Sequence, residues 1–316
     1  MPVPSDWSQK LKQFVDEWKR SPNSLDEKYW GDAPLPNFVL TEHADSWNDF
    51  LAWSSELQGS WCYRGQREAS WPLLTTLDRA VRRDHSSDYP SGIRVTGYHH
   101  LDREAEQREL LFRFQQQAHL YIENPPTTED LASWFALMQH HGAPTRLLDW
   151  TESLYVAAYF AFEQEAQEKR SAVWAIDLDW LERRGRELLA TEVLKSGNDS
   201  EARAQWENRS LAQRQEAEKA VIIRVNPMML NERMAVQQGI LLCKLFHEAP
   251  FSVTLMRMMI HPEAPTQPVV RKLELDKSHR TEFLRKLKAM NIHRASLFPG
   301  LDGFAQSLRL DLETKS

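Results

Sequence analysis

Residues 139–151 hold a dense group of side chains that could do chemistry. Polar and ionisable groups that bind anions, metal ions or protons stand close together here, namely His140, His141, Arg146 and Asp149. In residues 152–162, small and aromatic residues recur at helical spacing, which predicts a helix packed against the core. A rigid helix would hold these groups in fixed positions, so we consider this segment a candidate site.

The two adjacent histidines do not predict a metal site. Neighbouring residues of a helix point about 100° apart, so His140 and His141 cannot both face one ion. The sequence has no HExxH, CxxC or aspartate cluster to supply further ligands. We expect one histidine to cap a helix before Gly142, and the other to act as an acid, base or hydrogen-bond donor.

A second candidate site is the run Tyr63-Arg64-Gly65-Gln66. A guanidinium binds phosphate or carboxylate in a bidentate manner, and Gly65 lets a ligand or a second backbone come close. One interpretation of Arg64 is therefore an anion-binding residue. The other is a structural pairing with Asp149, and the two interpretations are compatible.

Two amides, Gln237 and Gln238, precede Gly239 at the start of an apolar run. Buried amides without partners are costly, so these side chains either bond to the backbone or face a cleft. The alternative is a solvated entrance to a strand.

The elements around these residues form no regular alternation of strand and helix. Helices are predicted at 6–20, 46–57, 101–122, 152–162, 230–236 and 278–290, with another that begins at 127–130. Strands are predicted at 60–66, 172–176, 221–225, 239–243 and 268–275. Short, irregularly spaced strands predict an α+β fold, a single domain with a mixed or antiparallel sheet flanked by helices. We expect an N-terminal helical extension over 1–44, the domain with its C-terminal extension over 45–310, and a tail over 311–316.

Composition narrows the class of protein. A chain of 316 residues, 41% of them hydrophobic, can bury a full core. A net charge of -6 gives no general attraction to nucleic acid or to anionic membranes. No apolar run approaches the roughly 20 residues of a membrane span, and the N-terminus lacks a signal core, so we expect a cytoplasmic protein. Cys62 and Cys243 stand in separate apolar runs and are expected to be buried free thiols.

Five segments together resemble the FRG-domain family. They occur in the family's order at 63–66, 71–79, 139–151, 233–239 and 295–303, and the likeness spans about 47–308. The aromatic-Arg-Gly triplet of the family is Tyr63-Arg64-Gly65 here. Members of this family are mostly bacterial, so the resemblance implies a bacterial source, and it implies a fold and a site more readily than a reaction.

The chain also resembles ADP-ribosyltransferases, which implies a fold of that kind. In those enzymes an aromatic-Arg-Gly on the first strand grips NAD, a second strand leads into a packed helix, and a glutamate heads a third strand. Residues 146–149 with 151–162 are similar to the second element. The third position falls at Gln237 or Gln238, and a neutral amide there forgoes about 3 to 4 kcal/mol of transition-state stabilisation. Asp149 or Glu232 would have to supply the charge instead.

The resemblances imply cleavage of NAD or transfer of ADP-ribose, with NAD as substrate and no other cofactor. The implied catalytic residues are Arg64, His140, Asp149 and Gln238. The implied binding residues are Tyr63, Gly65, Gln66, Arg146, Trp150, Thr151 and Tyr159. In this hypothesis Arg64 holds phosphate, Gln66 and Thr151 bond ribose, Trp150 or Tyr159 stacks the base, and Asp149 with His140 supplies charge or proton transfer. Expected partners are a nucleotide and a protein target, without membrane or nucleic acid.

Two alternatives use the same residues. In one, the protein is a non-catalytic sensor, and Arg64 with residues 139–151 binds a nucleotide or a partner. In the other, these motifs form a buried polar core, and removal of one partner of a buried pair chiefly lowers stability, by about 3 to 5 kcal/mol.

Overall fold

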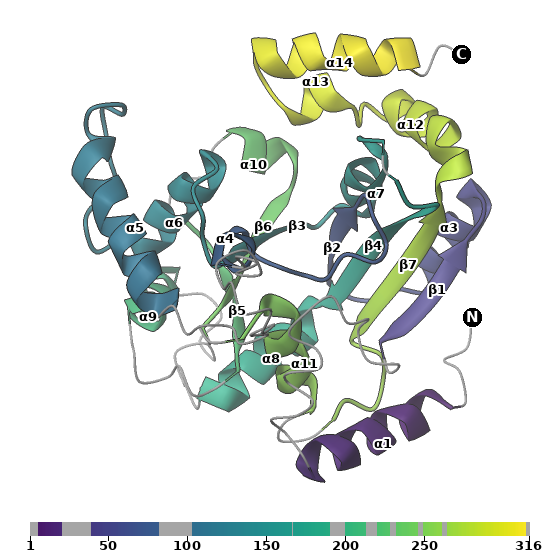
Figure 1. Cartoon of the computed structure of the whole chain (residues 1–316), viewed down its shortest axis with the longest axis horizontal. Helices are drawn as coiled ribbons and strands as arrows, with labels where there is room; N and C mark the ends of the chain where they lie inside the picture. Colours follow the sequence, from purple (N-terminus) through teal and green to yellow (C-terminus); the bar gives the residue numbers. More distant parts are fainter. Residues whose placement is uncertain are drawn as a thin grey trace, which may run out of the picture.

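The computed structural model describes residues 6–20, 39–81, 103–165, 167–189, 200–212, 220–227, 232–245, 249–260 and 264–313. Within these ranges one seven-stranded sheet forms the centre of the molecule (Figure 1). Its strands are β1 (Leu40–Ala44), β2 (Trp61–Gln66), β3 (Leu147–Thr151), β4 (Arg170–Asp177), β5 (Ile222–Val225), β6 (Gly239–Lys244) and β7 (Val270–Asp276). The spatial order is β1-β7-β4-β2-β3-β6-β5. β1 pairs with β7 in parallel and the other neighbours are antiparallel, which confirms the predicted α+β fold with a mixed sheet.

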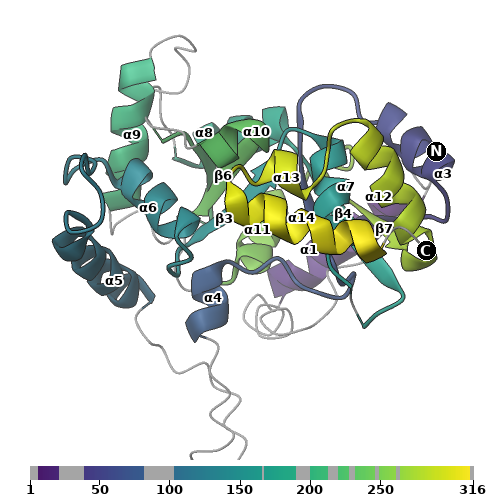
Figure 2. The same cartoon turned by 90° about the horizontal axis from the view of Figure 1, so that it is seen from above.

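Helices pack on both faces of this sheet. They are α1 (Trp7–Arg20), α3 (Trp47–Ser55), α4 (Thr76–Val81), α5 (Arg103–Ala118), α6 (Leu131–His140), α7 (Leu154–Phe162), α8 (Leu178–Leu189), α9 (Ser200–Ala212), α10 (Glu232–Val236), α11 (Phe251–Ile260), α12 (Arg280–Ala289), α13 (Arg294–Leu297) and α14 (Leu301–Glu313). One buried cluster joins α1, α8 and α11 to the sheet, and a second joins α3, α7 and α12 to its other face. A third cluster contains α5, α6 and α9 with β5 and β6. Figure 2 shows α13 and α14 beside α10 and α12.

Local signals in the sequence explain where several helices begin. Ser46 and Ser153 each accept a hydrogen bond from a backbone N–H in the first turn, of α3 and α7 respectively. Asp130 caps α6 in the same way, through the N–H of Ser133. Such caps typically contribute about 1 kcal/mol, so these positions fix the start of each helix.

The structure adds elements that the sequence pattern did not predict. β1 lies within the segment expected as a helical extension, where it joins the sheet as a parallel edge strand beside β7. The apolar run 251–260 forms α11, which is almost entirely buried. Parts of the predicted helices at 101–122 and 230–236 lie outside the described residues. Cys62 and Cys243 are buried and free, as predicted. Among the described helices, none has the length and apolar character that a membrane crossing requires.

Gly65 allows α7 to lie directly on β2. A Cβ atom at this position would stand 2.0 Å from the carbonyl oxygen of Ala157 and 2.6 Å from the amide nitrogen of Ala161. Of the two interpretations of this glycine, the close approach of a second backbone is therefore realised. This contact places the last part of β2 against α7, the helix that follows β3.

Candidate active site

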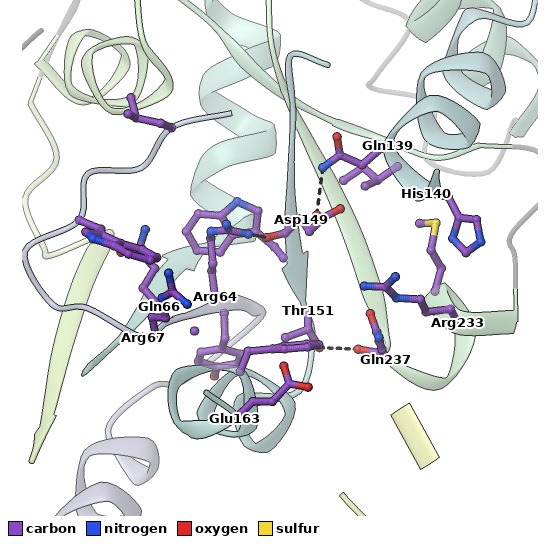
Figure 3. A pocket seen from close by; sticks show the side chains of 18 of the residues that line it. Arg64, Gln66, Arg67, Gln139, His140, Asp149, Thr151, Glu163, Arg233 and Gln237 are labelled. Carbon is purple, nitrogen blue, oxygen red and sulfur yellow. Dashed lines mark hydrogen bonds between the residues drawn. The ribbon is translucent and has the colours of Figure 1, made fainter. Parts of the chain in front are cut away.

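A cavity opens where β2 and β3 diverge. The two strands are paired at Tyr63 and Thr151, whereas β3 stays paired with β6 along its whole length. The cavity has a volume of about 770 Å³, within the range of small-molecule sites (Figure 3). Most of the predicted site residues line it, namely Tyr63, Arg64, Gly65, Gln66, His140, Asp149, Trp150 and Thr151.

Arg64 is half-buried in the wall of this cavity. Its Nη1 atom donates a hydrogen bond of 2.5 Å to the backbone oxygen of Asp149. Its Nε atom is buried and has no hydrogen-bond partner among the described residues. Burial lowers the pKa of Arg64 to about 10, against the opposing effect of Asp149, so the side chain is a cation at neutral pH. The predicted pairing with Asp149 thus uses the main chain and leaves the charge of the guanidinium available.

The carboxylate of Asp149 is held in place by a short chain of hydrogen bonds. Asp149 Oδ2 accepts a hydrogen bond of 2.9 Å from Gln139 Nε2. Gln139 Oε1 in turn accepts one of 2.5 Å from Thr145 Oγ1, which itself accepts one from the backbone N–H of Leu147. Because the hydroxyl of Thr145 has only one proton, these contacts fix which end of the Gln139 amide faces Asp149.

Cations outnumber anions around the cavity. The charged lining residues are Arg64, Arg67, Arg79, Arg233, Asp149 and Glu163. Within the described ranges none of these four arginines forms an ion pair, whereas Glu163 is paired with Arg294. Figure 3 shows Arg64 and Arg67 on one side, His140 and Arg233 on the other, and Asp149 between them. The cavity therefore has the electrostatic character of an anion-binding site.

His140 lies at the end of α6, at the edge of the cavity. Burial and the neighbouring charges of His141 and Arg233 lower its pKa, while Asp149 acts in the opposite direction. The imidazole is consequently neutral at neutral pH. The residue that ends the helix is His141, through its backbone N–H to Leu137 O. The described part of the chain contains no group of three or more His, Cys, Asp or Glu side chains placed to hold a metal ion.

Residues 59–170 match the family model of the FRG domain. The chain contains an FRG domain. Comparisons with curated proteins and with solved structures found no significant match. The FRG domain supplies β2, α6, β3 and α7, and thus Arg64, His140, Asp149 and Glu163. The wall that carries Arg233 and Gln237 comes from residues beyond it.

Some predicted site residues do not line this cavity. Arg146 is buried, donates a hydrogen bond of 2.6 Å to Leu211 O and lies over the ring of Phe135. Tyr159 is fully buried, and its hydroxyl donates to Glu163 Oε1.

Gln238 and Trp150 also lie differently from their predicted roles. Gln238 is exposed outside the lining with a φ of 48°, and its backbone oxygen accepts a hydrogen bond of 2.9 Å from Glu152 N. The Trp150 ring is 3% exposed and lies 6.4 Å from that of Phe251, in the core. Side chains alternate across a strand, so Trp150 and Asp149 point to opposite faces of β3.

Several residues of the FRG domain line the cavity but were not predicted from the sequence as site residues. They are Arg67, Trp71, Arg79, Glu163 and Gln164. Glu163 stands directly after α7, where an apolar helix ends in a carboxylate. That abrupt change from apolar to acidic residues was the available signal. Gln237, considered together with Gln238, lines the cavity, and its Nε2 atom donates a hydrogen bond of 2.8 Å to Leu297 O.

Proposed function

We propose that the cavity of the FRG domain binds a phosphate-bearing nucleotide, with NAD as the first compound to test. The observation that carries this proposal is the excess of arginines around a cavity of nucleotide size that have no ion pair among the described residues. Guanidinium groups bind phosphate oxygens through charge-assisted, often bidentate hydrogen bonds. Arg64 is the central phosphate ligand, because its backbone contact orients it and its charge is free.

The order of the strands also supports the proposal. The resemblance to ADP-ribosyltransferases singles out the strand with Arg64, the strand and helix that follow residue 146, and the start of a third strand. These elements are β2, β3 with α7, and β6, and they are consecutive in the sheet. Their meeting at one cavity is what a shared nucleotide site requires.

Cleavage of the bound NAD is a second candidate function, favoured by the carboxylate of Asp149. Among the described residues Asp149 forms no ion pair, and it lies between Arg64 on one side and Arg233 on the other (Figure 3). In hydrolysis, the bond between ribose C1′ and the nicotinamide nitrogen breaks and nicotinamide leaves with the electron pair. Water then adds to C1′ and releases a proton. A carboxylate stabilises the positive charge that develops on the ribose.

Calorimetry with ADP-ribose and NAD tests the proposal, with nicotinamide release followed in parallel. We expect the wild type to bind both compounds and Arg64→Ala to bind at least tenfold more weakly, because a hydrogen bond to a charged group is lost. Arg285→Ala is the matched control, since this exposed arginine of α12 lies outside the cavity. Absence of binding by the wild type, or equal binding by Arg64→Ala, would refute the proposal. Binding without nicotinamide release would support a non-catalytic nucleotide sensor and would refute NAD cleavage.

A further inference from the structure

Trp71 is an exposed aromatic residue that lines the cavity. It follows β2 in the segment that leads to α4, and it is 41% exposed while lining the cavity. Other large apolar side chains with comparable exposure, Val236 at 41% and Met290 at 42%, do not line the cavity. The sequence gives no separate signal for Trp71, because tryptophans more often anchor the core. Its position makes the ring accessible to a molecule inside the cavity.

The ring of Trp71 is held by its neighbours before any ligand arrives. The guanidinium carbon of Arg67 lies 4.7 Å from the ring centroid, and Arg67 Nη1 donates a hydrogen bond of 2.7 Å to Gln164 Oε1. The backbone N–H of Trp71 donates to Glu68 O. The Glu68 carboxylate in turn accepts from the backbone N–H groups of Gln167 and Glu168. Because these contacts already order the Trp71 side chain, ligand binding costs less side-chain entropy.

Side chains able to bind phosphate line the same cavity as this ring. Arg64, Arg67 and Arg79 line the cavity together with Trp71, and the Nε atoms of Arg64 and Arg67 are buried without a hydrogen-bond partner in the described residues. An aromatic face beside cationic donors matches a molecule in which a flat heterocycle is joined to phosphate. A phosphorylated sugar without a base would leave the ring unused.

We propose that Trp71 is the platform on which the base of the bound nucleotide stacks, and that it makes the site selective for nucleotides over sugar phosphates. This inference rests on the proposed nucleotide site. Stacking of a base on an aromatic side chain strengthens binding about 5- to 150-fold, and it tolerates different bases. Trp71 is thus a specificity-determining residue, whereas Arg64 supplies affinity for the phosphate.

The test compares AMP with ribose 5-phosphate, which carries the same sugar and phosphate without the base. Affinities are measured by calorimetry for the wild type, Trp71→Ala and Trp71→Phe. We expect the wild type to prefer AMP at least tenfold, Trp71→Ala to lose this preference, and Trp71→Phe to retain most of it. Ribose 5-phosphate should bind all three proteins equally, which also shows that the cavity of each variant is intact.

The matched control is Tyr121→Ala, which removes an 81% exposed aromatic ring away from the cavity and should bind AMP like the wild type. An undiminished preference for AMP in Trp71→Ala would refute base stacking on Trp71, whereas the proposed nucleotide site would remain supported. A loss of ribose 5-phosphate binding equal to the loss of AMP binding also overturns it, because the effect would not depend on the base. If the wild type binds neither compound, the platform falls together with the proposed function.

Discussion

Arg64 and Asp149 meet through a main-chain oxygen, and this contact leaves both of their charges available to a ligand. A carboxylate in the same place would neutralise the guanidinium and reduce its value for binding phosphate. Gln139 likewise orients Asp149 through a neutral amide, so the carboxylate is fixed without losing its charge. At the scale of single residues, the cavity holds charges in place mainly with uncharged partners.

Replacing Asp149 by asparagine should affect binding and cleavage in opposite directions. Asp149→Asn removes a negative charge from an anion site, so the affinity for ADP-ribose should rise severalfold. If the site cleaves NAD, nicotinamide release should fall about a hundredfold or more, because the developing positive charge loses its stabilisation. Calorimetry and nicotinamide chromatography measure the two effects, with the exposed Glu123→Gln as a control of equal charge change. A weaker affinity in Asp149→Asn would contradict the expected repulsion.

The lowered pKa of His140 predicts a pH dependence of ligand binding. In the free protein burial, and after it His141 and Arg233, disfavour its protonated form, whereas a bound anion would favour that form. Binding should therefore take up a proton, and the affinity for ADP-ribose should rise as pH falls from about 7.5 to about 5.5. ADP-ribose suits the measurement, because its phosphates stay ionised over this range. His140→Gln should flatten the profile, and an unchanged slope in that variant would assign the effect to another group.

The same pKa shift affects stability with the opposite sign. A histidine whose pKa is lowered in the folded state binds fewer protons there than in the unfolded chain. The folded protein therefore loses stability as pH falls through the unfolded value of about 6.5. Ligand binding and folding respond to acid in opposite ways at this residue.

At the scale of elements, the cavity results from one interruption of the sheet. β2 and β3 separate on one side of the paired residues Tyr63 and Thr151, while α7 lies directly against β2. The small residues of α7 and the absence of a side chain at Gly65 allow this helix to lie against β2. The geometry of the cavity thus depends on a backbone contact as much as on its lining side chains.

Gly65→Ala should destabilise the fold. The added methyl group would overlap the backbone of Ala157, and overpacking of a core typically costs about 1 to 3 kcal/mol, more where only backbone can yield. Gly185→Ala is the matched control, because its nearest neighbouring atoms are 3.8 Å away and it lies inside α8, where alanine favours the helix by about 0.5 to 1 kcal/mol. Urea unfolding measures both variants. Equal stability of Gly65→Ala and the wild type would contradict the close packing of α7.

At the scale of the whole molecule, residues beyond the matched FRG segment complete the site. Glu163 is paired with Arg294, and the guanidinium carbons of Arg233 and Arg294 lie 4.4 Å and 4.3 Å from the centroid of the Phe298 ring. Gln237 is fixed by Leu297 O. α10 thus carries lining residues of the cavity, and α13, outside the lining, supplies the cation that pairs with Glu163.

Removing the charge of Arg294 should weaken nucleotide binding from outside the cavity lining. Arg294→Gln leaves Glu163 without its cation, so a negative charge faces the ligand and the affinity for ADP-ribose should fall severalfold. Arg285→Gln makes the same change in net charge on α12 without a contact to the cavity. Calorimetry of the two variants separates the local effect from the global one. Equal affinities in both would show that Glu163 does not act on the ligand.

The sequence by itself determined the local structure and the central motif. Apolar periodicity and short β-branched or aromatic runs depend on neighbours within a few residues. These signals predicted most helices and strands, the α+β class and the buried thiols. Asp149, within a dense group of polar residues, and Arg64, a guanidinium beside Gly65, were also singled out as site residues, and both line the cavity.

Only the tertiary structure decided which side chains share the cavity. Trp150 and Asp149 are adjacent in the chain but lie on opposite faces of β3, and Arg146 and Tyr159 are buried behind the wall. Glu163 lines the cavity because α7 ends beside it, and Glu163 is the first residue after that helix. β1 joins the sheet because β7, more than two hundred residues later, offers an edge. Such choices depend on contacts between distant segments, and no local pattern records them.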